Sequence, residues 1–209
     1  MQDAGDHRRA MVQHQIIARG ICDARVIAAM GDVPREAFVP DVPLALAYAD
    51  GPLPIGMGQT ISQPYIVALM IEAAGIKPGD RILEVGAGSG YAAAIIGRIA
   101  GHVYAIERIA LLADRARRTM AALGYANVTI PCGDGTKGWP AAAPYDAILI
   151  PAAAPVVPPA LFAQLETGGR LVMPVGQPLQ QTLMCFTRHT DGGIATDDLG
   201  GVRFVPLIG

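Results

Sequence analysis

Three glycines at alternate positions, Gly86, Gly88 and Gly90, directly follow a short apolar run at residues 82–85. Glycine lets the backbone turn tightly and lets a ligand approach the main chain closely. The apolar run is typical of a buried strand, and the apolar residues 92–96 are typical of a helix. The pattern predicts a strand–turn–helix unit whose turn faces a ligand, the alternative being a tight turn without one.

Two acidic residues stand where they could contact such a ligand. Glu84 precedes the glycines, and Glu107 ends the next apolar run, twenty-one positions after Gly86. That spacing suits a carboxylate that accepts hydrogen bonds from ribose hydroxyls. The sixth position of the dinucleotide fingerprint is Tyr91 instead of glycine, and the chain has no Gly-Lys-Ser/Thr for a triphosphate. We therefore predict S-adenosylmethionine, with Glu84 facing its cationic amino-acid end.

Two further polar residues each have two possible roles. Asp134 follows a third apolar run and could hold an adenine amino group or cap a turn. Ser62 precedes Pro64, whose ring suits the first turn of a helix, so its hydroxyl could cap that helix. Nothing pairs a particular histidine with Ser62, and the scattered histidines and cysteines predict no metal site and no disulfide framework.

Composition excludes several classes of protein. The 209 residues carry 16 Lys+Arg against 18 Asp+Glu, and 52% are hydrophobic. That much apolar material can form one sizeable core. A disordered chain would contain fewer apolar residues, and a nucleic-acid-binding surface would show an excess of Lys and Arg. Residues 141–163 contain one charge but five prolines, so we expect a strand, a loop and a short helix instead of a membrane span. We expect a cytoplasmic protein whose three cysteines are buried thiols.

Alternation of apolar runs with helical stretches after residue 80 predicts an α/β fold with a mostly parallel, Rossmann-like sheet. A turn at 191–193 without a helix predicts that the sheet ends in an antiparallel strand. We expect a helical extension at 1–76, with Asp23 capping a helix and a loop at 56–64, packed on a main domain at 77–209. The candidate strands are 81–85, 103–107, 128–131, 147–150, 170–175, 182–188 and 202–207.

Segments in a fixed order carry a resemblance that covers nearly the whole chain. They are 33–40, 58–64, 83–90, 133–139, 152–155, 168–172 and 202–207. Together they resemble the protein-L-isoaspartate (D-aspartate) O-methyltransferase family, with 59–64 and 202–207 the most particular to it. The resemblance implies a class I S-adenosylmethionine-dependent methyltransferase fold with an N-terminal helical extension. It also implies methylation of the α-carboxylate of L-isoaspartyl residues in damaged proteins, whose ester collapses to a succinimide that can reopen to aspartate.

The resemblance also assigns site residues. Ser62 matches the family's active-site serine. The implied cofactor contacts are Gln59, Thr60, Ile61, Glu84, Gly86, Ala87, Gly88, Ser89, Gly90, Glu107, Asp134 and Gly135. The implied substrate contacts are Ser62, Ala152, Ala153, Val202, Arg203, Phe204, Val205 and Pro206. The implied product of the cofactor is S-adenosylhomocysteine, and the expected partners are isoaspartyl proteins and peptides, with no nucleic acid, no membrane and a monomeric enzyme.

These residues suit the chemistry. An isoaspartyl carboxylate is already ionised near neutral pH, so methyl transfer needs orientation and exclusion of water but no general base. Ser62 would orient the carboxylate and would not act as a nucleophile. The peptide should lie extended, paired with an edge formed by 202–207 or by the loop 55–59.

Two departures from the family pattern concern the acceptor side. Pro151 stands where the family usually has Gly or Thr, which removes a backbone donor beside the acceptor. The chain ends at Gly209, where many relatives continue with a short tail that helps to close the pocket. Two alternatives remain: a methyltransferase dedicated to one peptide, and a silent adaptor that binds the cofactor without turnover. A nucleic-acid amino-methylating enzyme would need Asn/Asp-Pro-Pro-aromatic after the fourth strand, which residues 151–155 lack.

Overall fold

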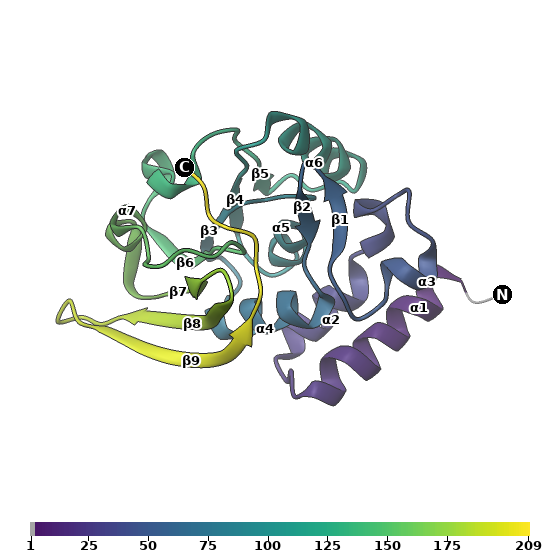
Figure 1. Cartoon of the computed structure of the whole chain (residues 1–209), viewed down its shortest axis with the longest axis horizontal. Coiled ribbons are helices and arrows are strands. Elements are labelled where there is room, and N and C mark those ends of the chain that lie inside the picture. The colour runs from purple at the N-terminus through teal and green to yellow at the C-terminus, as the bar shows by residue number, and fades with distance from the viewer. Residues whose placement is uncertain (1–2) are drawn as a thin grey trace.

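A seven-stranded sheet forms the centre of the computed structural model, which describes residues 3–209 (Figure 1). The strand order is β5-β4-β3-β6-β7-β8-β9, with parallel pairing up to β7 and antiparallel pairing beyond it. The predicted mostly parallel sheet with an antiparallel end is therefore confirmed. The strands are β3 (Arg81–Val85), β4 (His102–Ile106), β5 (Val128–Thr129), β6 (Tyr145–Leu149), β7 (Leu165–Gln177), β8 (Gln180–Arg188) and β9 (Ile194–Val202).

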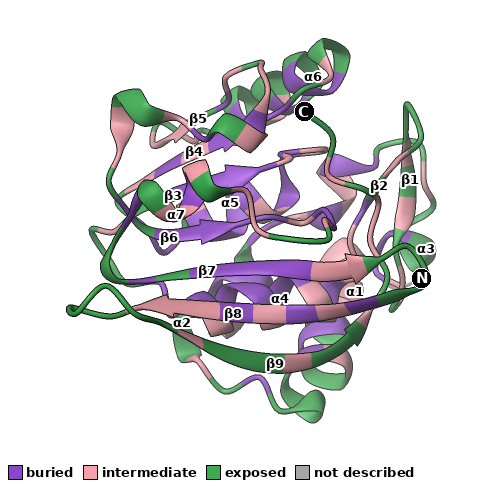
Figure 2. Ribbon diagram, turned by 60° about the vertical axis from the view of Figure 1, so that its left-hand side comes forward, coloured by how far each residue is buried: buried purple, intermediate pink, exposed green. Residues whose placement is uncertain are grey.

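Helices cover both faces of this sheet. Successive side chains of a strand point to opposite faces, and in the central strands the side chains on both faces are apolar and need to be buried. Ile82 belongs to a core cluster with the N-terminal helices and with α4, α5 and α6, whereas its neighbour Leu83 packs in a second cluster with Leu161. Figure 2 shows the resulting burial of the central strands and the exposure of β9 at the edge. The covering helices are α4 (Pro64–Ala74), α5 (Tyr91–Gly97) and α6 (Ala110–Ala122) on the first side and α7 (Pro159–Ala163) on the second.

The N-terminal part shares the first core cluster with the sheet. Met11 and Met30 are fully buried in the same cluster as Ile82 and Val172. Asp23 caps α2, as predicted, by accepting a hydrogen bond of 2.8 Å from the backbone of Arg25. This part contains α1 (Ala4–Met11), a π-helical turn (Val12–Ile16), α2 (Ala24–Asp32), α3 (Leu44–Ala47) and short 3₁₀ turns at Ile17–Arg19 and Arg35–Phe38.

A hairpin stands where the sequence predicted only a loop. β1 (Leu53–Gly56) pairs with β2 (Gln59–Ile61), and the turn between them places Gly56, Met57 and Gly58 at φ values of 87°, 54° and 70°. Glycine adopts such values readily, but Met57 does so against the preference of a side chain. The helix predicted to begin at Pro64 is confirmed as α4.

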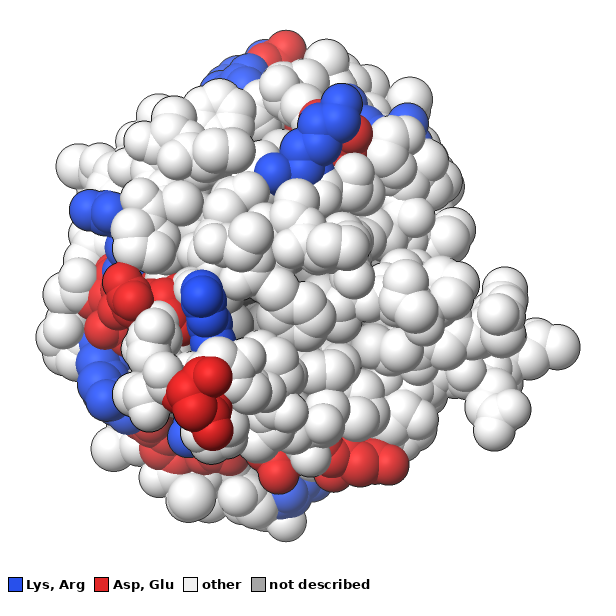
Figure 3. Space-filling view, turned by 90° about the vertical axis from the view of Figure 1, so that its left-hand side faces the viewer, with Lys and Arg blue, Asp and Glu red and all other residues white. Residues whose placement is uncertain are grey.

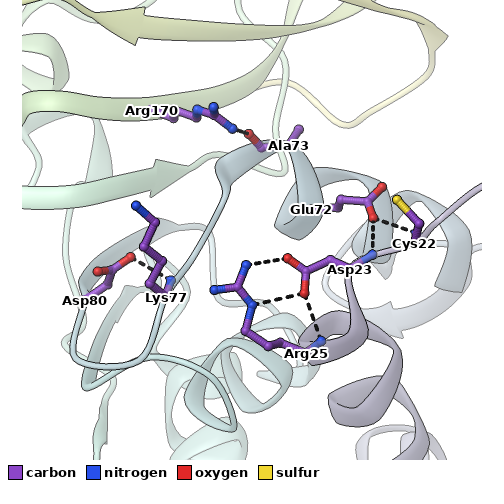
Figure 4. Close-up of polar contacts among 8 residues, drawn as sticks. All are labelled: Cys22, Asp23, Arg25, Glu72, Ala73, Lys77, Asp80 and Arg170. Atoms are coloured by element: carbon purple, nitrogen blue, oxygen red, sulfur yellow. Dashed lines mark hydrogen bonds and ion pairs between the residues drawn. The ribbon is translucent and has the colours of Figure 1, made fainter.

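The helix α4 is held at its C-terminal end by contacts from two directions (Figure 4). The Glu72 carboxylate accepts hydrogen bonds of 2.7 Å from the backbone amides of Cys22 and Asp23. Arg170 of β7 donates a 3.0 Å hydrogen bond to the carbonyl oxygen of Ala73. The helix that follows Ser62 is therefore fixed to both the N-terminal part and the sheet.

Three sequence predictions need correction. The strand predicted over 202–207 is wrong, because β9 ends at Val202 and only an isolated bridge, between Pro206 and Ala153 in the loop after β6, follows it. The strand predicted over 128–131 is shorter, Val128–Thr129. Of the three thiols predicted to be buried, Cys185 is, but Cys22 and Cys132 are exposed. Within residues 3–209, no helix is long and apolar enough to cross a membrane.

Candidate active site

A cavity of about 1070 Å³, counting the space that opens to solvent, lies at the carboxyl ends of β3, β4 and β6. Parallel α/β sheets bind ligands at this edge. The hairpin strand β2 and the C-terminal segment 205–208 form its other walls. The predicted site residues that line it are Gln59, Thr60, Ile61, Ser62, Glu84, Gly86, Ala87, Gly88, Ser89, Glu107, Gly135, Ala152, Val205 and Pro206.

The glycine-rich turn has the backbone conformation that its sequence predicts. Gly86, Gly88 and Gly90 have φ values of 101°, 54° and 90°, which favour glycine over residues with a side chain. The amide of Gly86 donates a 2.8 Å hydrogen bond to the carbonyl oxygen of Ile106, so the turn is attached to the end of β4. The turn therefore presents its backbone to the cavity in a fixed position.

Glu107 is buried at the end of β4 and is held by two backbone amides. One carboxylate oxygen accepts from Gly88 and the other from Ile109, each at 2.8 Å. Each carboxylate oxygen has capacity for a further hydrogen bond. The carboxylate can therefore accept from hydroxyl groups of a ligand without rearrangement.

Glu84 is 1% exposed, and its Oε2 atom has no hydrogen-bond partner within the described part of the chain. Burial, together with the nearby charge of Glu107, raises the pKa of Glu84 well above its usual range. A buried oxygen without a partner is unfavourable unless a ligand supplies one. Because Glu84 lines the cavity, a cationic group bound there would satisfy it.

A second hollow opens beside the cavity, and the two share Thr60, Ser62, Pro151 and Val205 as common walls. This acceptor hollow, as we call it, is lined by residues 201–205 and by the β7–β8 turn. Its predicted site residues are Thr60, Ser62, Val202, Arg203, Phe204 and Val205. Two neighbouring ligands could therefore meet at Ser62.

Ser62 does not cap the helix that follows it, which was the local alternative. The N-cap residue of α4 is Gln63, and no side chain caps that helix end. Ser62 instead lies between the hairpin strand β2 and α4, on the wall that both hollows share. The structure therefore contradicts the capping role of the Ser62 hydroxyl.

Three predicted site residues do not line either hollow. Asp134 caps a 3₁₀ turn (Gly135–Lys137), accepting from Thr136, and this hydrogen bonding lowers the pKa of its carboxyl group. Gly90 lies at the start of α5, where it is the N-cap. Ala153 pairs with the C-terminal segment, donating to Val205 and accepting from Leu207 at 2.8 and 2.7 Å.

The structure adds lining residues that the sequence did not single out. Apolar side chains from one face of α4 close the floor of the cavity, and Pro151 lies between the two hollows. Helical spacing in α4 could have indicated a buried face, but not that this face meets a ligand cavity. The added residues of the cavity are Val67, Met70, Ile71, Val85, Tyr91, Ala92, Ile106, Arg108, Ile109, Leu149 and Ile208.

Comparison with solved structures supports this architecture. A solved protein-L-isoaspartate O-methyltransferase superposes with a TM-score of 0.87 at 31% identity over 97% of this chain, which spans 66% of that structure. A Plasmodium falciparum structure, described as a β-aspartate methyltransferase in complex with S-adenosyl-L-homocysteine, gives 0.83 at 26% identity, covering 97% of this chain and 98% of that one. A Geobacter metallireducens precorrin-6y C5,15-methyltransferase, 13% identical, shares only the fold, with a TM-score of 0.52 over 66% of this chain and 85% of its own.

Sequence comparison is more specific. The protein-L-isoaspartate O-methyltransferase of Methylorubrum extorquens is 58% identical over 206 residues, which cover 99% of this chain and 90% of the relative. That of Rhodopseudomonas palustris is 58% identical over 200 residues, covering 95% and 92%. The sequence profile of protein-L-isoaspartate(D-aspartate) O-methyltransferases matches residues 6–209. The chain therefore belongs to the protein-L-isoaspartate(D-aspartate) O-methyltransferase family.

Proposed function

We propose that this protein transfers the methyl group of S-adenosylmethionine to the α-carboxylate of L-isoaspartyl residues in damaged proteins and peptides. The resulting ester collapses to a succinimide with loss of methanol, and the succinimide can reopen to aspartate. The observation that carries the proposal is the junction of two hollows at Ser62, one of them containing a buried acid without a partner. Membership of the family supports the identity of the acceptor.

The cavity fits S-adenosylmethionine. Glu84 offers its free oxygen to the cationic amino-acid end, and Glu107 offers both oxygens to the ribose hydroxyls. The positive φ values at the glycines allow the cofactor to approach the backbone. In this proposal the cofactor-binding residues are those predicted residues that line the cavity, Gln59, Thr60, Ile61, Glu84, Gly86, Ala87, Gly88, Ser89, Glu107 and Gly135. Bound cofactor would supply the electrophilic methyl group.

The acceptor carboxylate would enter from the second hollow. A carboxylate with an ordinary pKa of about 4 is ionised at neutral pH, so the enzyme needs no base to activate it. The Ser62 hydroxyl would donate one hydrogen bond and aim an oxygen at the methyl group, without burying an opposite charge. We propose Ser62, Ala152, Val202, Arg203, Phe204, Val205 and Pro206, which line the two hollows, as contacts of the peptide.

A peptide in the acceptor hollow would lie along the segment 202–205. Phe204 donates to and accepts from the side chain of Gln181, which holds this segment against β8. Main-chain contacts would let the enzyme accept many flanking sequences, because they read no side chains. The pairing is not an extension of a strand over 202–207, because β9 ends at Val202.

The setting that we propose is a monomeric enzyme in the cytoplasm that acts on protein substrates and not on nucleic acid. On the face in Figure 3, basic and acidic side chains lie close to one another in mixed groups. A nucleic-acid surface would gather basic residues. The free thiols of Cys22, Cys132 and Cys185 suit a reducing compartment.

The test is repair of a synthetic isoaspartyl peptide. The protein is incubated with S-adenosylmethionine and the peptide at 37 °C and neutral pH, and chromatography separates isoaspartyl, succinimidyl and aspartyl forms. We expect the isoaspartyl peak to decline as methanol and the aspartyl peak rise. Binding of the cofactor with no change in any peptide would support an adaptor and contradict the proposal.

A further inference from the structure

Arg35 is a buried cation that has no role in the proposed methyl transfer as described above. It lies in the 3₁₀ turn Arg35–Phe38 of the N-terminal part and is 0% exposed. It forms no ion pair with a carboxylate in the described part of the chain, and its Nη1 atom has no hydrogen-bond partner there. Burial lowers the pKa of Arg35. A buried charge without an opposite charge is costly, so its contacts need an explanation.

The guanidinium group of Arg35 joins three separate parts of the protein. Its Nε atom donates a 2.8 Å hydrogen bond to the carbonyl oxygen of Ala47, the last residue of α3. Its Nη2 atom donates a 2.9 Å hydrogen bond to the carbonyl oxygen of Ser62. Its central carbon lies 4.8 Å from the centre of the Tyr91 ring. Arg35 thus contacts the backbone of Ser62 and the first residue of α5 at once.

Those two contacts lie on opposite sides of the proposed reaction. Ser62 is on the wall shared with the acceptor hollow, whereas Tyr91 directly follows the glycine-rich turn and lines the cofactor cavity. Tyr91 is itself held by Phe38, whose ring packs edge-on at 5.4 Å. A rigid link between the two walls would fix the distance between donor and acceptor.

We propose that Arg35 is a positioning residue that fixes Ser62 relative to the glycine-rich turn, and so the acceptor carboxylate relative to the methyl group. This inference rests on the proposed function. Methyl transfer is an in-line displacement, in which a misplacement of about 1 Å can lower the rate about 100-fold. Arg35 lines neither hollow and acts through its hydrogen bond to the backbone of Ser62.

The geometry explains why arginine stands at this position. The planar fork can direct two nitrogens at two carbonyl oxygens while its face rests on an aromatic ring. The single ammonium of lysine could reach Ala47 or Ser62 but could not hold both in the same arrangement. The arginine stands in a segment of otherwise mostly apolar residues, 33–39, which is the signal that the sequence offers.

The test compares Arg35→Lys and Arg35→Gln with the wild-type protein on an isoaspartyl peptide. We expect kcat to fall about 10-fold to 100-fold, and less in Arg35→Lys than in Arg35→Gln, because donor and acceptor are no longer aligned. The dissociation constant for S-adenosylhomocysteine should stay within about 2-fold of the wild-type value, because no cofactor contact is lost. Hydrogen exchange should speed up at residues 62–66 and stay unchanged in β3.

Arg170→Met is the matched control, since Arg170 makes the same kind of contact at the opposite end of α4. Its kcat should remain within about 2-fold of wild type. Wild-type kcat in a folded Arg35→Gln protein would overturn the proposal. So would an equal loss of cofactor affinity and of kcat/KM, because that pattern indicates general disruption.

The design separates this inference from the proposed function. A wild-type protein that fails to methylate the peptide contradicts the function, while hydrogen exchange at 62–66 still tests whether Arg35 holds Ser62. If neither Arg35 variant folds, Tyr91→Leu removes the ring beneath the guanidinium and leaves both hydrogen bonds possible. We expect it to lower kcat at least about 3-fold because the fork loses its support, and an unchanged kcat would overturn the proposal.

Discussion

The backbone amide of Gly88 donates a 2.8 Å hydrogen bond to the carboxylate of Glu107. This contact joins the middle of the glycine-rich turn to the end of the neighbouring parallel strand, β4. The acid that we assign to the ribose hydroxyls is therefore oriented before a ligand arrives. A site that is already ordered loses less entropy on binding.

Replacement of Glu107 by glutamine should weaken cofactor binding. The amide group of glutamine would point a donor at the amide of Gly88 or of Ile109, and the charge that strengthens hydrogen bonds to hydroxyls would be lost. We expect the dissociation constant for S-adenosylhomocysteine, measured by calorimetry, to rise about 10-fold to 100-fold.

Glu72→Gln is the matched control for Glu107. Glu72 also accepts hydrogen bonds from two backbone amides (Figure 4). It lies at the far end of α4 and does not line the cavity. Its cofactor affinity should equal that of the wild-type protein. If both variants lost affinity equally, the assignment of Glu107 to the cofactor would be wrong.

Ser62→Ala should lower turnover and leave cofactor affinity nearly intact. The hydroxyl is the donor that we assign to the acceptor carboxylate, and loss of one oriented donor typically costs about 100-fold in kcat. Steady-state kinetics with an isoaspartyl peptide measures turnover, and calorimetry measures cofactor affinity. Collapse of cofactor binding with normal turnover per bound cofactor would show that Ser62 serves the cofactor instead.

The stability of the cofactor-free protein should depend on pH through Glu84. Burial raises the pKa of Glu84 above that of the unfolded chain, so the folded protein holds this proton more tightly than the unfolded one. The stabilisation is complete below the unfolded carboxyl pKa, about 4.3, and is lost as pH rises through the folded pKa. Thermal unfolding should therefore show the wild-type protein losing stability with rising pH relative to Glu84→Gln.

Saturating S-adenosylhomocysteine should reduce this difference at neutral pH, because its amino group gives the Glu84 carboxylate a partner. Cofactor affinity in the wild-type protein should accordingly increase as pH rises through the pKa of Glu84, whereas in Glu84→Gln this dependence should disappear. Parallel pH curves for the two proteins, with and without ligand, would rule out Glu84 as the group that binds the cationic end.

The close approach of Gly135 to the sheet gives a test of local packing. A Cβ atom on Gly135 would lie 2.5 Å from Cγ1 of Val85, a buried residue of β3. Gly135→Ala should therefore destabilise the protein by about 1 to 3 kcal/mol, as overpacking of a core does. Gly133→Ala is the control, because its Cβ would meet nothing within 4 Å. Equal denaturant midpoints for the two variants would contradict this packing.

The sequence predicted those parts of the fold that depend on local signals. Apolar runs indicated β3 and β4, and the glycines indicated a turn in which Gly86, Gly88 and Gly90 all have positive φ. The sequence did not predict β9, because Asp197, Asp198 and two glycines are residue types that disfavour strands. Pairing with β8 keeps this segment extended.

Residues of the site that depend on tertiary contact could not be predicted in the same way. The local sequence before Pro64 favoured a helix-capping role for Ser62. Only the resemblance to the family assigned its hydroxyl to the acceptor carboxylate. Arg35 lies in the segment 33–40, which carries part of the family resemblance, but its hydrogen bonds to Ala47 and Ser62 join residues 12 and 27 positions away in the sequence. Hydrophobic periodicity predicts local elements but gives no information on contacts between residues so far apart in the sequence.

The most direct measurement compares two peptides of identical sequence, one with an isoaspartyl and one with an aspartyl residue. Each is incubated with the protein and S-adenosylmethionine carrying a labelled methyl group, and the initial rate of label transfer to the peptide is recorded. We expect a base-labile ester on the isoaspartyl peptide and none above background on the aspartyl peptide. Equal rates on both peptides, or transfer to neither while the cofactor is bound, would contradict the proposed function.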